Sequence, residues 1–149
     1  MTQKQKILQH YNQLLQDRID IFRDMIADLT QDALNDAKGS AGDKHETALS
    51  MMHLEQEKLN HKLKEILNQK AILDKIDAST MHSKIALGSL VQANGMLLFI
   101  SAALPKITID GKTIIAVSLQ SPLVTKLIGQ EKGFTFEINA SIYTIETIQ

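Results

Sequence analysis

Two series of apolar residues, each repeating every seven positions, restrict the first half of this chain to a pair of packed helices. A spacing of seven keeps apolar side chains on one side of a helix, as in coiled coils. The two series are mirror images about one point between residues 40 and 41. The mirror-related pairs are Leu8 with Leu73, Leu15 with Ile66, Phe22 with Leu59 and Leu29 with Met52. A single fold-back would bring all four pairs together, which predicts an antiparallel coiled-coil hairpin over residues 1–79.

The predicted fold-back lies in Lys38-Gly39-Ser40-Ala41-Gly42, which holds the glycines of this half of the chain. Glycine ends helices readily, and this half contains no proline. Each arm would have about 30 residues, or about 45 Å at a rise of 1.5 Å per residue. We expect Tyr11, Met25, Leu49 and Leu63 to fill the intervening positions of the apolar seam. The same heptads would also suit a compact helical bundle or pairing between subunits.

The second half, residues 83–149, has the pattern of a β domain. Asn94-Gly95 and Asp110-Gly111 separate apolar runs, and such pairs are strong signals of tight hairpin turns because these residues tolerate positive φ. Strict alternation of apolar and polar residues on both sides of Asn139-Ala140 predicts a third turn. The runs predicted as strands are 87–91, 96–103, 107–109, 113–117, 134–138 and 141–145. We therefore expect a small twisted antiparallel sheet.

One short helix interrupts these strands. Ser121-Pro122 has the pattern of an N-cap residue followed by proline at the first helical position. Leu123, Leu127 and Ile128 would form its apolar face, and Gly129 would end it. The predicted fold class is therefore α+β, with a hairpin of helices followed by an antiparallel sheet that holds one helix.

The composition excludes several classes of function. Lys and Arg (16) nearly balance Asp and Glu (17), so the overall charge does not favour binding to duplex DNA. The absence of cysteine excludes disulfides, thiolate metal sites and a cysteine nucleophile. No apolar run approaches the roughly 18 residues of a membrane span, and the N-terminus lacks a signal-peptide core. We expect a cytoplasmic protein that has no contact with a membrane.

The segment Gly42-Asp43-Lys44-His45-Glu46-Thr47-Ala48-Leu49, which we call the tip, opens the second predicted helix with two carboxylates. The spacing of Asp43 and Glu46 fits a capping box, in which Asp43 accepts from backbone N–H groups and Glu46 reaches back from the third helical position. The same two carboxylates are also hard oxygen ligands that suit Mg²⁺. Two ligands bind Mg²⁺ weakly, so we expect no metal at the tip alone. The pair could instead complete a two-metal site that a partner supplies.

Three segments of the chain occur together in one known family. They are Gly42-Asp43-x-x-Glu46-x-Ala48, Leu87-Gly88-Ser89-Leu90-Val91 and the segment from Ser121 to Gly129. In this order they resemble the G-D-L-S-E-N-A-E-Y tip, the F-G-S-x-V strand and the S-P-[IL]-x-x-A-L-[IL]-G helix of the Gre family of bacterial transcript cleavage factors. The resemblance covers essentially the whole chain, and the three matches together are specific.

The resemblance implies that the hairpin enters the secondary channel of bacterial RNA polymerase. Asp43 and Glu46 would there help to hold the second Mg²⁺ for cleavage of backtracked RNA, so the nascent RNA 3′ end would be a partner only indirectly. An FKBP-like domain over residues 83–149, to which Ser121 to Gly129 would contribute, would dock on the polymerase surface. The implied function is a transcription elongation factor that activates the polymerase, needs no cofactor of its own and is not an enzyme by itself.

The chain departs from the family pattern at the tip and along the first helix. Lys44-His45 stands where the family has Leu-Ser, Thr47 where it has Asn, and Leu49-Ser50 where it has Glu-Tyr, which puts cleavage in question more than channel entry. Acidic residues at four-residue steps form a slowly drifting stripe along the first helix, in contrast to the basic patch with which Gre factors grip RNA. The stripe is Asp20, Asp24, Asp28, Asp32 and Asp36. It is either a solvated face or a match to a basic surface.

Two alternatives to a cleavage factor therefore stay open. One is a regulator or inhibitor that binds the secondary channel without promoting cleavage, and the other is a coiled-coil adaptor unrelated to transcription. We expect no metal site at His45, His53 and His61, because a spacing of eight spreads them round the helix. The pair Met51-Met52 is expected to pack within the hairpin, since Met fills irregular gaps.

Overall fold

The computed structural model of the chain describes the backbone of residues 1–39 and 43–149 and the side chains of residues 1–35 and 46–149. Two long helices, α1 (Gln3–Gly39) and α2 (Asp43–Asp74), precede a sheet and one short helix, α3 (Pro122–Leu127). The fold is α+β, as predicted. The chain divides into two compact units. The hairpin unit is Gln13–Lys70, and the sheet unit consists of Met1–Asn12 together with Ala71–Gln149.

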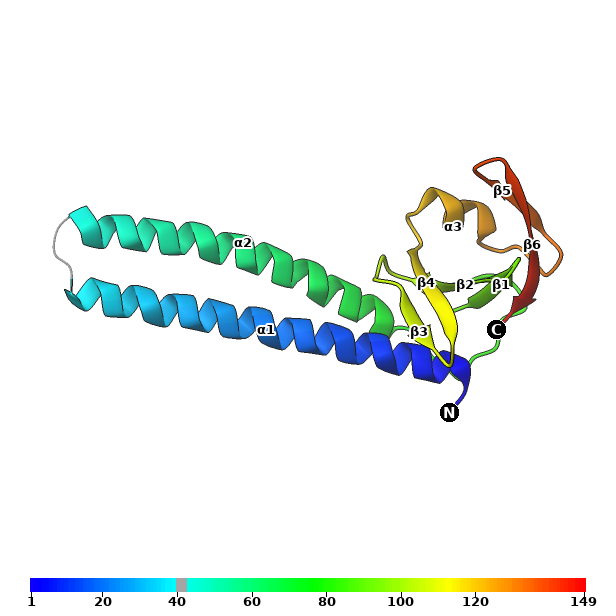
Figure 1. Cartoon of the computed structure of the whole chain (residues 1–149), viewed down its shortest axis with the longest axis horizontal. Coiled ribbons are helices and arrows are strands. Elements are labelled where there is room, and N and C mark those ends of the chain that lie inside the picture. Colours follow the sequence, from blue (N-terminus) through cyan, green and yellow to red (C-terminus); the bar gives the residue numbers. More distant parts are fainter. Residues whose placement is uncertain (40–42) are drawn as a thin grey trace. The chain divides into compact units, whose positions relative to one another are not determined.

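In the hairpin unit, α1 and α2 run antiparallel to each other (Figure 1). Each mirror-pair residue in this unit is buried or half-buried: Leu15, Phe22, Leu29, Met52, Leu59 and Ile66. Gln56 Nε2 on α2 donates a hydrogen bond to Thr30 Oγ1 on α1 at 2.7 Å. Leu29 and Met52, which the mirror pairing sets opposite each other, line the same cavity between the helices. The predicted helical hairpin is confirmed.

Two residues that we expected in the seam lie elsewhere. The side chain of Met25 is 45% exposed. Tyr11 is fully buried, but within the sheet unit, where its hydroxyl donates to the carbonyl oxygen of Pro105 at 2.7 Å. Its ring also stacks on Phe99, with ring centroids 6.2 Å apart. Heptad spacing indicates which side of a helix is covered, but it cannot tell whether a second helix or a sheet covers it.

The six strands form one mostly antiparallel sheet in the order β3-β4-β2-β1-β6-β5. They are β1 (Leu90–Ala93), β2 (Met96–Ser101), β3 (Ile107–Ile109), β4 (Lys112–Ser118), β5 (Thr135–Ile138) and β6 (Ser141–Ile148). The one departure from the predicted antiparallel pattern is the parallel pairing of β2 with β4, in which Leu97 lies opposite Ile114. The β3–β4 hairpin places its longer strand inside the sheet, where it pairs on both sides, and leaves the short β3 at the edge.

All three predicted two-residue turns are confirmed. Asn94-Gly95 joins β1 to β2, Asp110-Gly111 joins β3 to β4, and Asn139-Ala140 joins β5 to β6. The first residue of each pair has a φ of about 50°: 48° at Asn94, 52° at Asp110 and 49° at Asn139. The second residues also have positive φ, between 67° at Ala140 and 83° at Gly95. Positive φ at both positions is the geometry of the hairpin turns that match the twist of the strands.

The strand predicted over residues 87–91 begins later, at Leu90. Gly88 has a φ of +88° and donates its backbone N–H to the carbonyl oxygen of Ile100 at 2.7 Å. A Cβ on Gly88 would lie 2.9 Å from Cγ2 of Ile76, so a larger residue here would collide with the segment that follows α2. The positive φ and the close approach to Ile76 therefore both require glycine at this turn. The strand begins only after the turn.

Helix α3 begins as predicted but ends at Leu127, and Ile128, which we expected on its apolar face, lies beyond the helix and is 41% exposed. Ser121 is its N-cap, and the Ser121 hydroxyl accepts a hydrogen bond from the backbone N–H of Val124 at 3.2 Å. Pro122 occupies the first turn, where the missing N–H costs nothing. Gly129, with a φ of 79°, follows the last turn. Val124 and Leu127 are buried in the core of the sheet unit, and α3 therefore covers one face of the sheet.

The sheet unit also includes the ends of the two long helices. Residues 1–12 and 71–79, which the sequence assigned to the hairpin domain, lie in the same compact unit as the sheet. From these segments Ile7, Tyr11 and Leu73 are at most 1% exposed. Lys4 is also buried, and its ammonium donates to the carbonyl oxygen of Thr80 at 2.5 Å. The sheet is thus packed against helical residues that lie far from it in the sequence.

Candidate functional site

The described part of the tip is the start of helix α2. The helix begins at Asp43, and Glu46 lies in its first turn with an exposed side chain. A residue three positions after another in a helix lies on the same face, so the two residues share one side of the first turn. The side chain of Asp43 lies outside the described residues, and so does the cap that we predict for it. The exposed side chain of Glu46 is accessible to a partner molecule.

The residues by which the tip departs from the Gre pattern have different environments. Thr47 and Ser50 are exposed, whereas Leu49 is half-buried on the seam side of α2. Leu49 thus packs within the hairpin, as its heptad position predicts. The Gre pattern has Glu at the corresponding position. The side chains of Lys44 and His45 lie outside the described residues.

Among the side chains that the structure describes, no group of three or more His, Asp or Glu residues is placed to hold a metal ion. His53 and His61 are both exposed on α2, and Nε2 of His61 lies 3.3 Å from Oε1 of Glu65 on the next turn. Glu46 offers hard oxygens that suit Mg²⁺, and Asp43 would add a second pair from the same turn. Two carboxylates leave most of an octahedral coordination sphere to water or phosphate. Asp43 and Glu46 could therefore contribute only part of a Mg²⁺ site.

The acidic stripe of α1 is exposed over its described part. Asp20, Asp24, Asp28 and Asp32 all face solvent, and Asp36 has no described side chain. Oδ1 of Asp20 accepts a hydrogen bond from Nε2 of Gln16 at 3.0 Å. None of these four carboxylates forms an ion pair with a side chain in the described part of the chain. Their charge is therefore available to a cationic partner.

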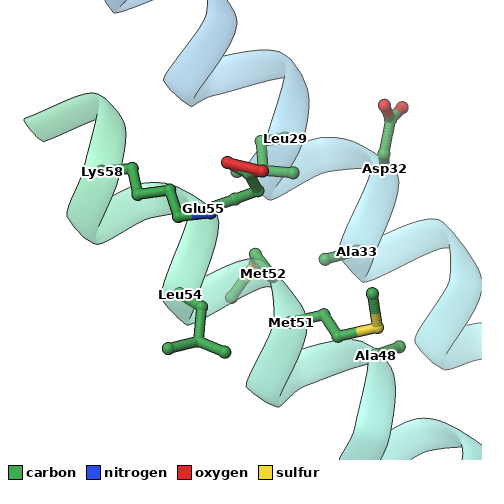
Figure 2. Close-up of a pocket in the computed structure, with 9 residues that line it drawn as sticks. All are labelled: Leu29, Asp32, Ala33, Ala48, Met51, Met52, Leu54, Glu55 and Lys58. Carbon is green, nitrogen blue, oxygen red and sulfur yellow. The ribbon is translucent and has the colours of Figure 1, made fainter.

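A cavity of about 450 Å³ lies between the two helices next to the tip (Figure 2). Its wall combines apolar and charged side chains, with Leu29, Asp32 and Ala33 on α1 and Ala48, Met51, Met52, Leu54, Glu55 and Lys58 on α2. We predicted Met51 and Met52 as packing residues. Met52 is half-buried, but Met51 is 64% exposed, so the prediction was wrong for Met51. Met51 lies off the heptad series, and that spacing is the signal by which its exposure could have been predicted.

A second cavity, of about 570 Å³, lies in the sheet unit beside α3. It is almost wholly apolar, and its wall is formed by Ile85, Ala86, Leu87, Leu119, Thr125, Ile128 and Gly129. The last three residues belong to the Ser121 to Gly129 segment that the family resemblance assigns to docking. Ile128 is 41% exposed at this cavity, so a large apolar side chain is presented there.

The groups with shifted pKa values among the described residues belong to the sheet unit. Burial raises the pKa of Tyr11 to about 12. Burial also lowers the pKa of Lys4, against the opposing effect of the nearby Asp77 carboxylate. The pKa of Asp77 is itself held below its usual range, mainly by hydrogen bonds from Ser79. Lys4, Tyr11 and Asp77 lie where the helix ends pack within the sheet unit.

Comparison with models of known protein families and with curated proteins finds no match for this chain. In the part of the chain that the structure describes, no helix is both long and apolar enough to cross a membrane.

Proposed function

We propose that this chain is a Gre-like transcription elongation factor, which inserts its hairpin into the secondary channel of bacterial RNA polymerase. The observation that carries the proposal is the position of the acidic tip. Helix α1 ends at Gly39, α2 begins at Asp43, and the exposed Glu46 lies in the first turn of α2. A pair of carboxylates at the turn of a narrow helical hairpin can reach a recessed site that a globular domain cannot enter.

In this proposal Asp43 and Glu46 hold the second Mg²⁺ jointly with groups of the polymerase. The bound ion would activate a water molecule and stabilise charge on the phosphate of backtracked RNA. The two carboxylates contribute negative oxygens and position, and the polymerase contributes the remaining ligands and the RNA. The chain is therefore an activator of the polymerase and not an enzyme by itself. The order of the three Gre-like segments and the α+β fold support this assignment.

The sheet unit would supply docking on the polymerase surface, and the cytoplasm would be its location. When two binding elements are linked in one chain, binding of the first raises the effective concentration of the second at its own site. A docked sheet unit would therefore keep a weakly bound tip in the channel. The partly exposed Ile128 beside α3 supports a contact role for this unit.

The test uses backtracked elongation complexes of the polymerase from the same organism. Wild-type protein should shorten the transcripts, and the double substitution D43N/E46Q should reduce cleavage by at least about 100-fold, the scale of losing a metal-holding group. Binding to the polymerase should persist, because amides keep the size and most of the capping capacity of the carboxylates. The control is D20N/E57Q, which removes two exposed carboxylates from the hairpin outside the tip.

A second candidate is a channel-binding regulator that does not promote cleavage. The observation that favours it is the exposed acidic stripe of α1, which lacks cationic partners among the described side chains. Wild-type protein that slows elongation but leaves backtracked transcripts at full length would support this candidate. A chain that fails to bind the polymerase at all would instead be a coiled-coil adaptor in which Asp43 only caps a helix.

A further inference from the structure

The hairpin unit presents large apolar side chains to solvent on one side. On α1, Ile21 is 56% exposed and Met25 is 45% exposed. On α2, Met51 is 64% exposed and Leu54 is 61% exposed. Four such residues on two adjacent helices exceed the single exposed apolar side chains that are normal on a protein surface. This part of the hairpin is therefore incompletely covered.

Helical geometry places these residues and several charges on the same side of the helix pair. Ile21, Met25, Asp28 and Asp32 follow one another at steps of four, three and four residues, so they form one stripe along α1. Met51, Leu54, Glu55 and Lys58 follow at steps of three, one and three residues and form one stripe along α2. Asp32 from the first stripe and all four residues of the second line the 450 Å³ cavity. We call this cavity, together with the rest of the α1 stripe on the same side of the helix pair, the acidic groove.

The acidic groove has an apolar floor and a negative rim. Leu29 and Met52 are half-buried beneath it. Figure 2 shows Met51 extending from α2 toward α1, and Leu54 pointing away from the helix pair. Between Ile21 and Asp32 on α1 and between Met51 and Lys58 on α2, the rim carries three carboxylates, at Asp28, Asp32 and Glu55, against one ammonium at Lys58, and none of them forms an ion pair within the described residues. The cations Arg18 and Lys62 lie about one turn beyond these ends on the same stripes.

We propose that the acidic groove binds an amphipathic helix whose apolar side is flanked by Lys or Arg residues. A groove between two antiparallel helices is the shape that accepts a third helix, and its exposed Met and Leu side chains can adapt to the incoming apolar residues. The excess of carboxylates selects for positive charge on that helix. This inference does not depend on the proposed function, because it rests on the hairpin unit alone.

A second copy of this chain is a poorer occupant. Packing one acidic groove on another would place the Asp28 and Asp32 carboxylates of both copies in the same interface, where like charges cost free energy. A surface of anionic lipids would be repelled in the same way. A cationic helix meets both the apolar and the electrostatic character of the groove.

The test measures binding of a fluorescein-labelled Leu/Lys amphipathic peptide of about 18 residues, five helical turns, to the full-length chain. The comparison probe is a Leu/Glu peptide with the same apolar pattern. We expect the Leu/Lys peptide to bind at least about tenfold more tightly than the Leu/Glu peptide. Because exposed ion pairs are individually weak, D28N/D32N should weaken binding of the Leu/Lys peptide about fivefold. D20N/E57Q, which removes two carboxylates outside the groove, should leave the affinity unchanged.

The apolar part of the groove is tested by Leu54→Ser. Leu54 is largely exposed, so the variant should keep the melting temperature of the wild type while binding the Leu/Lys peptide about tenfold more weakly. The matched control is Leu34→Ser. Leu34 is 52% exposed and lies nine residues beyond Met25, half a turn round α1 from the groove. This control should bind as the wild type does.

Three results would overturn the proposal. Equal affinity for the Leu/Lys and Leu/Glu peptides would show that the groove does not select for charge. Equal losses in L54S and L34S would place the binding elsewhere. Concentration-dependent dimerisation in sedimentation, abolished by L54S, would show that a second copy of the chain fills the groove. None of these results bears on RNA cleavage, so the proposed function stands or falls separately.

Discussion

Tyr11 connects the start of α1 to the sheet. Its ring is fully buried and lies parallel to Phe99 of β2, with an interplanar angle of 2°. A buried phenol needs a hydrogen-bond partner, and the carbonyl oxygen of Pro105 in the loop between β2 and β3 supplies one. The Tyr11 side chain therefore connects α1 to strand β2 and to the loop between β2 and β3. This contact fixes the position of that loop.

The substitution Tyr11→Phe should destabilise the protein by about 1 kcal/mol, because it removes the hydrogen bond that the buried phenol donates to the carbonyl oxygen of Pro105. Urea unfolding followed by circular dichroism would measure the change. Tyr143→Phe is the matched control. Tyr143 stacks on Phe136 and is half-buried, and its hydroxyl forms no hydrogen bond within the described residues. A loss in Y143F as large as that in Y11F would contradict the role assigned to the Tyr11 hydroxyl.

The same residue makes stability depend on alkaline pH. The pKa of Tyr11 is raised from 10.0 to about 12 by burial, so the folded state keeps the phenolic proton in a range where the unfolded state has lost it. Stability from this group is full below pH 10 and is lost as the pH rises toward 12. The free energy of unfolding of the wild type should therefore fall more between pH 9 and pH 11 than that of Y11F. Parallel losses in the two proteins would refute this linkage.

At the scale of the element, the β1–β2 turn is tied to strand β6 by one side chain. Nδ2 of Asn94 donates to the carbonyl oxygen of Ile142 at 3.0 Å, and Oδ1 of Asn94 accepts from the backbone N–H of Thr144 at 3.2 Å. Asn94 also has a φ of 48°, which costs little for Asn and more for Ala. The backbone of Asn94 thus adopts the geometry of the turn, and its side-chain amide links the turn to strand β6.

Two substitutions separate these contributions. Asn94→Ala loses both side-chain hydrogen bonds and strains the backbone, and should cost about 2–3 kcal/mol. Asn94→Gly loses only the hydrogen bonds and should be about 1 kcal/mol less costly. Asn139→Gly is the control, because Asn139 has a similar φ of 49° and no side-chain hydrogen bond among the described residues. Thermal unfolding would rank the three, and equal effects of N94G and N139G would show that the bridge to β6 contributes nothing.

The turns and the α3 cap were predictable because each depends on a few adjacent residues. The backbone geometry of these segments is set by their own residues and does not depend on the surrounding structure. The segments are Asn94-Gly95, Asp110-Gly111 and Ser121-Pro122. The parallel pairing of β2 with β4 was not predictable in this way, since it depends on which strand of the β3–β4 hairpin lies inside the sheet. The position of Tyr11 was predicted wrongly for the same reason, because its partners Phe99 and Pro105 lie far away in the sequence.

The candidate site was predictable in position, and its surroundings were not. The predicted fold-back point between residues 40 and 41 lies outside the described residues, whereas α1 ends at Gly39, α2 begins at Asp43 and Glu46 is exposed in the first turn of α2. The acidic groove was missed because it needs residues from two helices at once. Its signal was the exposure of Met51 and Met25, which only the packed hairpin reveals.

For the whole molecule, the two compact units are interleaved in the sequence. The hairpin unit, Gln13–Lys70, is inserted between two segments of the sheet unit. The sheet unit buries Lys4, Ile7 and Tyr11 from before the insertion and Leu73 and Ile76 from after it. A cut at residue 83 would therefore remove buried side chains from the sheet unit, although it keeps every strand.

Two truncated chains test this organisation. In the first, residues 13–70 are replaced by a short Gly-Ser linker, which keeps every segment of the sheet unit. In the second, the chain starts at residue 83 and lacks both helical segments. The first should unfold cooperatively. The second should be at least about 3 kcal/mol less stable, the cost of removing one large core side chain such as Tyr11, or should show no cooperative transition. Equal stability would mean that the helical segments cover the sheet without stabilising it.

The first truncated chain also divides the proposed function between the units. If the sheet unit docks on the polymerase, this chain should compete with the full-length protein for binding, because it retains α3 and the apolar cavity beside Ile128. It should give no cleavage of backtracked RNA, because Asp43 and Glu46 are absent. Full-length D43N/E46Q is the matched control, since it should show the same loss of cleavage while retaining the hairpin. A truncated chain that is folded yet fails to compete would place the polymerase contacts in the hairpin and remove the docking role from the sheet unit.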